Sequence, residues 1–274
     1  MSKAAERTLV LLEQVARASA PCGLLEIAGR AGLDKTTCSR LLALLVARGW
    51  LVRDAETKKY SVGPTFVGIA MSASLPDQVR MHFFPLLHEL REASGETVSL
   101  QRRFGQLRVC VAGLESREML RRGLPVGDAL PLTAGPSGKV ILAFVGADTV
   151  NELSTGLTDD QQHVLHEHLH LIRQVGYLST DGDRTPGVGA ISVPLFARDG
   201  VYGSLTLAGP SSRFDAPTRV ASLPALFGAA RDLSALLGAD PARYDAWPTA
   251  PTTPPTTPHT TPPARSDPAT AAQH

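Results

Sequence analysis

The 274-residue sequence contains few cysteines and no long apolar run. Its three cysteines, Cys22, Cys38 and Cys110, are odd in number and widely spaced, so they support neither a disulfide framework nor a CxxC metal pair. No apolar run approaches the roughly 20 residues that are needed to span a bilayer. The segment from Met1 to Arg7 is polar and lacks the apolar core of a secretory signal. We therefore expect a cytoplasmic protein with reduced thiols and no membrane partner.

Charged residues are also sparse, at 19%, but hydrophobic residues make up 43% of the chain, which is the composition of a globular protein. The length favours two domains, because one domain usually has about 100–200 residues. Residues 1–60 contain ten Lys and Arg against six Asp and Glu, whereas residues 61–244 contain sixteen against eighteen. A basic first segment is compatible with nucleic-acid binding, and ordinary scatter of surface charge is the alternative.

Residues 1–63 predict three helices followed by a β-hairpin. Apolar residues recur at helical spacing in residues 9–16, 24–32 and 41–46. Asp34 is suited to cap the third helix, and two short β-prone stretches, residues 50–53 and 59–62, flank a polar turn. This order of elements is that of a winged helix-turn-helix.

The remaining chain predicts linker helices, an α+β domain and a tail. In the linker, residues 64–94, a helical stretch from Phe66 to Ser94 is interrupted near Pro76 and Pro85. In the α+β domain, residues 95–240, we expect strands at 97–103, 107–114, 190–196 and 201–209 and helices at 137–144, 159–175 and 216–237. The tail, residues 241–274, is rich in proline and threonine, and we expect it to be disordered.

The third helix is the candidate DNA reader. In a helix-turn-helix the second helix of the pair lies in the major groove, with its N-terminal residues toward the bases. That face, together with the tip of the hairpin, carries the candidate DNA-binding residues Lys35, Thr36, Thr37, Ser39, Arg40, Lys58 and Lys59. The alternative is a helical bundle with a polar exposed face.

Motifs in both halves of the chain resemble those of the IclR family of bacterial transcription regulators. In the first half they are Leu24 to Ala28, Ala31 to Leu42, Arg48 to Trp50 and Lys59 to Pro64. In the second half they are Leu130 to Ala134, Gly138-Lys139, Ile172-Arg173, Gly176-Tyr177, Ile191 to Pro194 and Ser204 to Pro210. The resemblance covers about residues 6–238, in the order in which the family has these motifs.

The resemblance implies an α+β protein with an N-terminal winged helix-turn-helix, a linker helix and a GAF-like effector-binding domain. It further implies a transcription regulator, more often a repressor, that binds a palindromic double-stranded operator as a homodimer or homotetramer. A small metabolite would control DNA binding, and neither a cofactor nor an enzymatic activity is expected. A DNA-binding scaffold that takes no ligand is the remaining non-enzymatic alternative.

The effector pocket is placed by the position of the family's pocket. By this resemblance the effector-binding residues are Thr133, Ala134, Pro136, Ser137, Thr180, Asp181, Ala190, Ser192, Thr206 and Ala208. Backbone N–H groups before a helix that starts at Ser137 are suited to hold a carboxylate. Because this lining is small and weakly polar, we expect a larger and less charged effector than a keto acid, such as an aromatic acid or a sugar derivative.

One motif favours an enzyme instead. His166 to His170 matches HExxH, the helix signature of zinc hydrolases, in which the two histidines bind the metal and Glu167 acts as a base. The motif needs a third ligand, but no glutamate follows Glu167 and no histidine follows His170 before His259. A zinc hydrolase is kept as the alternative function. Because the third ligand is missing, an amphipathic helix with histidines on its solvent face is the simpler explanation.

Overall fold

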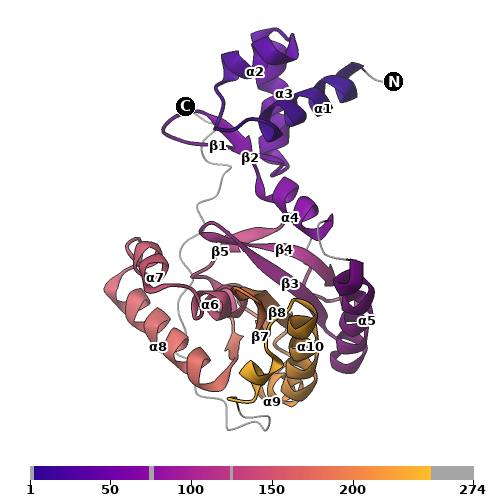
Figure 1. Cartoon of the computed structure of the whole chain (residues 1–274), viewed down its shortest axis with the longest axis vertical. Helices are drawn as coiled ribbons and strands as arrows, with labels where there is room; N and C mark the ends of the chain where they lie inside the picture. The colour runs from indigo at the N-terminus through magenta and orange to yellow at the C-terminus, as the bar shows by residue number, and fades with distance from the viewer. Residues whose placement is uncertain (1–2, 74–76, 124–125, 248–274) are drawn as a thin grey trace.

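The computed structural model describes residues 3–73, 77–123 and 126–247. A small N-terminal domain lies at one end of the molecule and a larger sheet-containing domain at the other, with α4 between them (Figure 1). In the described part of the chain, no helix is long and apolar enough to cross a bilayer. The predicted break near Pro76 and residues 248–274 of the predicted tail lie outside the described residues.

The N-terminal domain is a winged helix-turn-helix, as predicted. Its elements are α1 (Lys3–Ala16), α2 (Leu24–Ala31), α3 (Lys35–Ala47), β1 (Leu51–Arg53) and β2 (Tyr60–Val62). The turn between α2 and α3 is tight because Gly32 adopts a left-handed φ of 63° and Asp34 caps α3, accepting a 2.9 Å hydrogen bond from the Thr37 N–H. The fully buried side chains of this domain include Leu11, Ile27, Leu42 and Leu51.

Two helices follow the wing: α4 (Pro64–Ala73) and α5 (Asp77–Ser94). The expectation of a break near Pro85 was wrong, because α5 continues through this proline. A proline lacks only one amide donor, and packing of the helix against the sheet and α10 compensates for that loss. At Gly68, α4 approaches the loop before β5 so closely that an added Cβ would lie 2.6 Å from the Gly127 Cα.

The C-terminal domain is built on one six-stranded antiparallel sheet. Its strands are β3 (Thr97–Phe104), β4 (Leu107–Leu114), β5 (Ala129–Pro131), β6 (Leu178–Asp181), β7 (Val188–Ala197) and β8 (Gly200–Pro210). Their order across the sheet is β5-β4-β3-β8-β7-β6. The four predicted strands are confirmed, and the two short edge strands, β5 and β6, were not expected.

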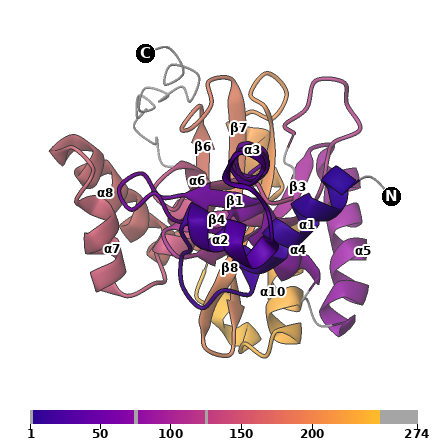
Figure 2. The ribbon, with the colours of Figure 1, turned by 90° about the horizontal axis from the view of Figure 1, so that it is seen from above.

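Helices cover both faces of this sheet (Figures 1 and 2). They are α6 (Gly135–Leu142), α7 (Ala147–Ser154), α8 (Asp159–Val175), α9 (Ala216–Ala221), α10 (Leu223–Leu236) and the short 3-10 helix η1 (Pro241–Tyr244). On one side α5 and α10 pack together, and on the other α6 packs against both the sheet and α8. The predicted single helix at 216–237 is two helices that meet at Ser222, and α7 was not predicted.

The two faces of the sheet differ in chemistry, because alternate residues of a strand point to opposite sides. In β3, Val98 and Leu100 belong to the main apolar core, whereas Ser99 and Gln101 lie on the other face. The same alternation occurs in β8, where Leu205 and Leu207 join the core. The α6 side of the sheet therefore carries small and polar residues, which leaves room for a pocket there.

The predicted start of the disordered tail at residue 241 was wrong for residues 241–247. Tyr244 and Trp247 are buried, and their rings contact those of Phe196 and Phe227. The Tyr244 hydroxyl also donates a 2.7 Å hydrogen bond to the carbonyl of Pro194. Two large aromatic side chains bury enough apolar area to order a short segment, and the proline count of the tail hides that contribution.

Candidate functional site: a DNA-reading helix and a basic pocket

The first two turns of α3 present polar side chains to solvent. Lys35, Thr36, Ser39 and Arg40 are exposed and Thr37 is partly exposed. On the other side of the helix Cys38 is fully buried. Because the leucines of α3 pack into the core of the domain, this polar face is held rigidly at the protein surface.

The wing presents the other two candidate DNA-binding residues. Lys58 and Lys59 are exposed in the turn between β1 and β2. The Asp54 carboxylate organises this turn by accepting hydrogen bonds from the backbone N–H groups of Glu56 and Thr57. The wing is therefore a defined turn that carries two positive charges beside α3.

The C-terminal domain contains a pocket between the N-terminal end of α6, the polar face of the sheet and the β6–β7 loop. The free volume inside it is about 50 Å³, enough for a few water-sized groups, so the pocket suits a small ligand. Its lining residues are Ser99, Gln101, Arg108, Arg122, Gly135, Pro136, Ser137, Thr180, Asp183, Arg184, Thr185, Val188, Ala190, Thr206 and Ala208.

Six of the ten predicted effector residues line this pocket: Pro136, Ser137, Thr180, Ala190, Thr206 and Ala208. The other four, Thr133, Ala134, Asp181 and Ser192, are not among its lining residues. Ser192 forms a 2.8 Å hydrogen bond with the Thr206 hydroxyl, and Asp181 accepts one from Ser211. A role in effector binding stays a prediction for all ten.

The N-terminal end of α6 opens into the pocket. The helix starts at Gly135, two residues earlier than predicted, and its N-cap residue, Ala134, has no side-chain acceptor for the first amides. Gly135 has a φ of 73°, and an added Cβ would lie 3.4 Å from an Nη atom of Arg108. Glycine is favoured here because the backbone conformation is left-handed.

The pocket carries more charge than the sequence led us to expect, because three arginines line it. They are Arg108 of β4, Arg122 of the β4–β5 loop and Arg184 of the β6–β7 loop. None of these three arginines, nor Gln101, was predicted from the sequence. The available signal was Arg108 itself, a charged residue in the otherwise apolar stretch from Leu107 to Val111.

Two of these missed side chains are buried and incompletely satisfied. Arg108 is 4% exposed, and Gln101 is 1% exposed. Among the described residues, no partner bonds the Arg108 Nε or the Gln101 Oε1. Burial lowers the pKa of the Arg108 guanidinium to about 10. Because an unpaired buried charge is costly, this arginine favours an anionic ligand.

A buried ion pair closes the pocket on the α6 side. The Lys139 Nζ lies 2.9 and 2.8 Å from the two carboxylate oxygens of Asp183. This ion pair joins α6 to the β6–β7 loop, and both of these elements are walls of the pocket. His168 of α8 is also buried nearby, and neither of its ring nitrogens has a hydrogen-bond partner in the described part of the chain. Burial, and next the Lys139 ammonium, lower the pKa of His168 to about 4.

We predict that His168 makes the protein less stable as the pH falls from about 6.5 to about 4. The unfolded chain takes up the proton near pH 6.5, whereas the folded protein resists it until about pH 4, so acid favours unfolding in this window. Over this range the free energy of unfolding of the wild type should fall by up to about 1.4 kcal/mol per pH unit more than that of His168→Leu. Denaturant titrations over this pH range measure the difference. A matched change at the exposed His166 should not alter the slope.

In the part of the chain that the structure describes, the HExxH residues are not grouped with a third metal ligand. The two motif histidines, His166 and His170, are on the exposed surface of α8, where their rings contact Gln162 and Gln174. Glu167 faces His163 at 3.2 Å. Within residues 3–73, 77–123 and 126–247, no three His, Cys, Asp or Glu side chains are grouped so that they could hold a metal ion.

A winged helix-turn-helix joined to a domain with a basic pocket defines a DNA-binding protein with a ligand-sensing domain. The chain belongs to the IclR family: the IclR helix-turn-helix domain matches residues 4–55, and the bacterial transcriptional regulator IclR C-terminal domain matches residues 76–235. It is a transcriptional regulator with a DNA-binding N-terminal domain and an effector-binding C-terminal domain, and not an enzyme.

The chain is similar to known proteins over most of its length. The chain is 31% identical to the regulator BhcR of Paracoccus denitrificans, over 85% of this chain and 86% of BhcR. It is 26% identical to the repressor AllR of Escherichia coli K12, over 86% of this chain and 91% of AllR. A crystal structure of an IclR homologue from Microbacterium hydrocarbonoxydans with 4-hydroxybenzoate has a TM-score of 0.57 and 22% identity, over 87% of this chain and all of that one.

Proposed function

We propose that this regulator is a repressor that binds a palindromic operator as a homodimer or homotetramer and leaves it when an organic acid enters the C-terminal pocket. The exposed polar face of α3, held by a buried leucine core, is the observation that carries the proposal. The repressor assignment is supported by the similarity to AllR. Since its target is DNA, we place the protein in the cytoplasm.

In this proposal α3 reads bases and the wing binds the DNA backbone. Arg40 and Lys35 are suited to donate to guanine, and the neighbouring hydroxyl side chains are suited to contact bases or phosphates. Lys58 and Lys59 lie at the tip of a turn, where their ammonium groups reach phosphates or the minor groove. Two copies of the domain would read the two half-sites of a palindrome.

The pocket is connected to the DNA-binding domain by a short route. The β4–β5 loop carries Arg122 at the pocket and Gly127 at α4, where an added Gly127 Cβ would lie 2.7 Å from the Thr65 Cα. Thr65 is at the start of α4, directly after the wing. A ligand that moves Arg122 would shift α4 between two positions. The size of its effect on DNA binding is set by the difference between its affinities for the protein in these two positions.

An organic acid is the effector class that the pocket supports best. Among the described residues no carboxylate forms an ion pair with the buried Arg108, and the uncapped N-terminus of α6 also favours a negative group. Because of these charges, we propose an organic acid in place of the less charged effector that the sequence suggested. The Microbacterium homologue crystallised with 4-hydroxybenzoate, which is an aromatic acid.

Arg40→Ala tests the DNA-reading role of α3. Fragments of genomic DNA enriched by the purified protein provide the operator, and binding is then measured on that operator and on a random duplex. The variant should lose about 1–3 kcal/mol of operator affinity and part of its sequence preference, because one base contact is removed. Unchanged operator affinity would rule out this docking of α3.

Two further substitutions serve as comparisons in the same assay. Lys58→Ala should weaken binding to both duplexes about equally and lower the salt slope by about one unit, because a phosphate contact carries no sequence preference. Arg17→Ala removes an exposed arginine directly after α1 that is outside the proposed interface, and it should behave like the wild type. A loss of sequence preference in Lys58→Ala would assign base reading to the wing instead.

A further inference from the structure

The charges around the pocket do not balance. Four basic side chains, Arg108, Arg122, Arg184 and Lys139, lie at or beside it, but only two carboxylates do, Asp128 and Asp183. Lys139 already pairs with Asp183. Among the described residues this leaves an excess of two positive charges, and a ligand with a single carboxylate would neutralise only one of them.

The first anion-binding position is defined around Gly135. An added Cβ at this glycine would lie 3.4 Å from an Arg108 Nη and 3.9 Å from the Arg184 Cβ. The buried guanidinium of Arg108, with its unpartnered Nε, therefore meets the N-terminal end of α6 and the β6–β7 loop at one point. Within the described chain this guanidinium donates one hydrogen bond, a long one of 3.5 Å, to the carbonyl of Ala134.

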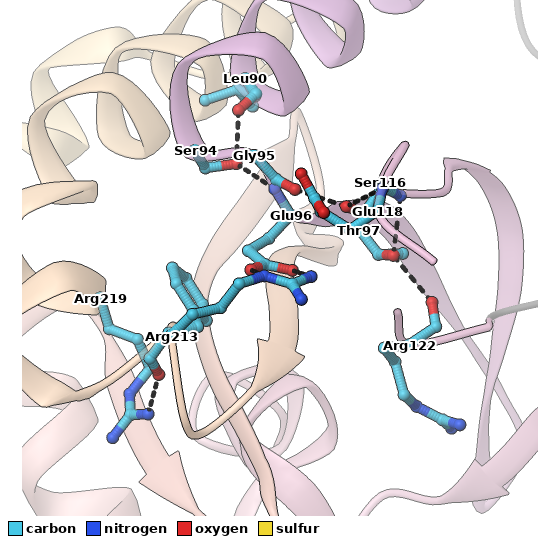
Figure 3. Close-up of polar contacts among 11 residues, drawn as sticks. Leu90, Ser94, Gly95, Glu96, Thr97, Ser116, Glu118, Arg122, Arg213 and Arg219 are labelled. Atoms are coloured by element: carbon cyan, nitrogen blue, oxygen red, sulfur yellow. Dashed lines mark hydrogen bonds and ion pairs between the residues drawn. The ribbon is translucent and has the colours of Figure 1, made fainter. Parts of the chain in front are cut away.

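The second position is at Arg122, which comes from a different wall. A buried threonine holds its backbone: the Thr97 hydroxyl donates a 2.7 Å hydrogen bond to the Arg122 carbonyl and accepts one from the Ser116 N–H (Figure 3). The Ser116 hydroxyl in turn bonds the Gly95 carbonyl. In Figure 3 the Arg122 side chain extends away from this network, and its guanidinium is left to line the pocket.

No carboxylate of the described chain forms an ion pair with Arg122, although Arg121 beside it pairs with Glu115 at 2.7 Å. Asp128 acts on Arg108 and Arg122 through space and is itself partly buried. One carboxylate shared between two guanidinium groups leaves room for more negative charge. The β4–β5 loop therefore holds the Arg122 guanidinium at the pocket, and the protein does not fully neutralise the charge of this group.

We propose that the effector of this regulator is a small dianion, with one acid group bound by Arg108 at the α6 N-terminus and the other bound by Arg122. This inference rests on the proposed effector pocket and names its ligand class. Dicarboxylates have the required chemistry. A ligand hydroxyl between the two acid groups would also donate to the unpartnered Oε1 of Gln101.

Titration calorimetry with paired probes on the full-length protein tests the proposal. The probes are succinate, glutarate and adipate, each compared with its monomethyl ester, which has one negative charge fewer. We expect at least one dianion to bind about tenfold or more tighter than its monoanion partner, because one charge-assisted contact is lost in the partner.

Arg122→Gln identifies the residue responsible for the second charge. This variant should bind the preferred dianion about tenfold more weakly and its monoanion partner within about twofold of the wild type. Arg121→Gln, one residue earlier and outside the pocket lining, should keep the full preference for the dianion. Equal affinity of the wild type for the two members of every pair would overturn the dianion proposal.

The failure of the proposed pocket has a separate signature. 4-Hydroxybenzoate and the monoanions report whether any organic acid binds and releases operator DNA. If monoanions bind and release DNA but no dianion is preferred, the effector pocket stands and only the dianion assignment fails. If no acid of either charge binds, both the dianion assignment and the proposed organic-acid pocket are wrong.

Discussion

Replacement of Lys139 by methionine is expected to lower the free energy of unfolding by about 3–5 kcal/mol, the usual cost of removing one partner of a buried ion pair. The side chains of Lys139 and Asp183 are 5% and 8% exposed, so their ion pair is shielded from water. Methionine matches the length of the lysine stem, and the loss therefore reports on charge more than on packing. Urea or guanidinium titration of the full-length protein measures it.

The double variant Lys139→Met/Asp183→Leu separates the charge from the contact. With both charges removed, no unpaired ion is left, and most of the stability of the wild type should return. The exposed pair Arg17 and Glu13, 3.9 Å apart at the C-terminal end of α1, is the control, because a surface ion pair contributes at most about 1 kcal/mol. If Lys139→Met alone costs less than about 1 kcal/mol, the pair is not buried in solution as it is in the structure.

The helices and strands that the sequence predicted well are those with strong local signals. Asp34 caps α3 and Gly32 ends α2, as the residue types indicate, and α8 begins after Thr158 and ends at Gly176. The Asp199-Gly200 pair forms the turn of the β7–β8 hairpin. In each case a few neighbouring residues determine the backbone, and this information is readable without the fold.

The missed segments depend on distant contacts. The strands β5 and β6 are short, and pairing with β4 and β7 at the edges of the sheet stabilises them. Tyr244 and Trp247 are ordered by the rings of Phe196 and Phe227, which lie far away in the sequence. Segments of low local propensity were therefore predicted as loop or tail, although tertiary packing orders them.

The site was predicted unevenly for the same reason. Family motifs placed the α6 loop and the strands β6, β7 and β8, and six residues from these elements line the pocket. Arg108 and Arg122 belong to β4 and its following loop, outside those motifs, and only the sheet order brings them beside α6. A charged residue in an apolar strand signals a buried site, but it does not reveal which element lies opposite.

Leu42→Ala is expected to unfold the DNA-binding domain while the C-terminal domain remains folded. Leu42 is fully buried in the core of a domain of about 60 residues, where truncation of a leucine costs about 2–5 kcal/mol. Domains of this size have little stability to spare, so such a loss abolishes folding of the domain near 37 °C. Operator binding should disappear, whereas organic-acid binding to the basic pocket should persist.

The matched control is Leu44→Ala, which truncates a half-exposed leucine on the same helix and should leave operator binding nearly unchanged. Hydrogen exchange followed residue by residue distinguishes the two domains: in Leu42→Ala, residues 3–63 should exchange at the rate of an unfolded chain while the sheet stays protected. Loss of protection in both domains together would show that α4 joins them into one cooperative unit. The effector would then control the stability of the DNA-binding domain as well as its position.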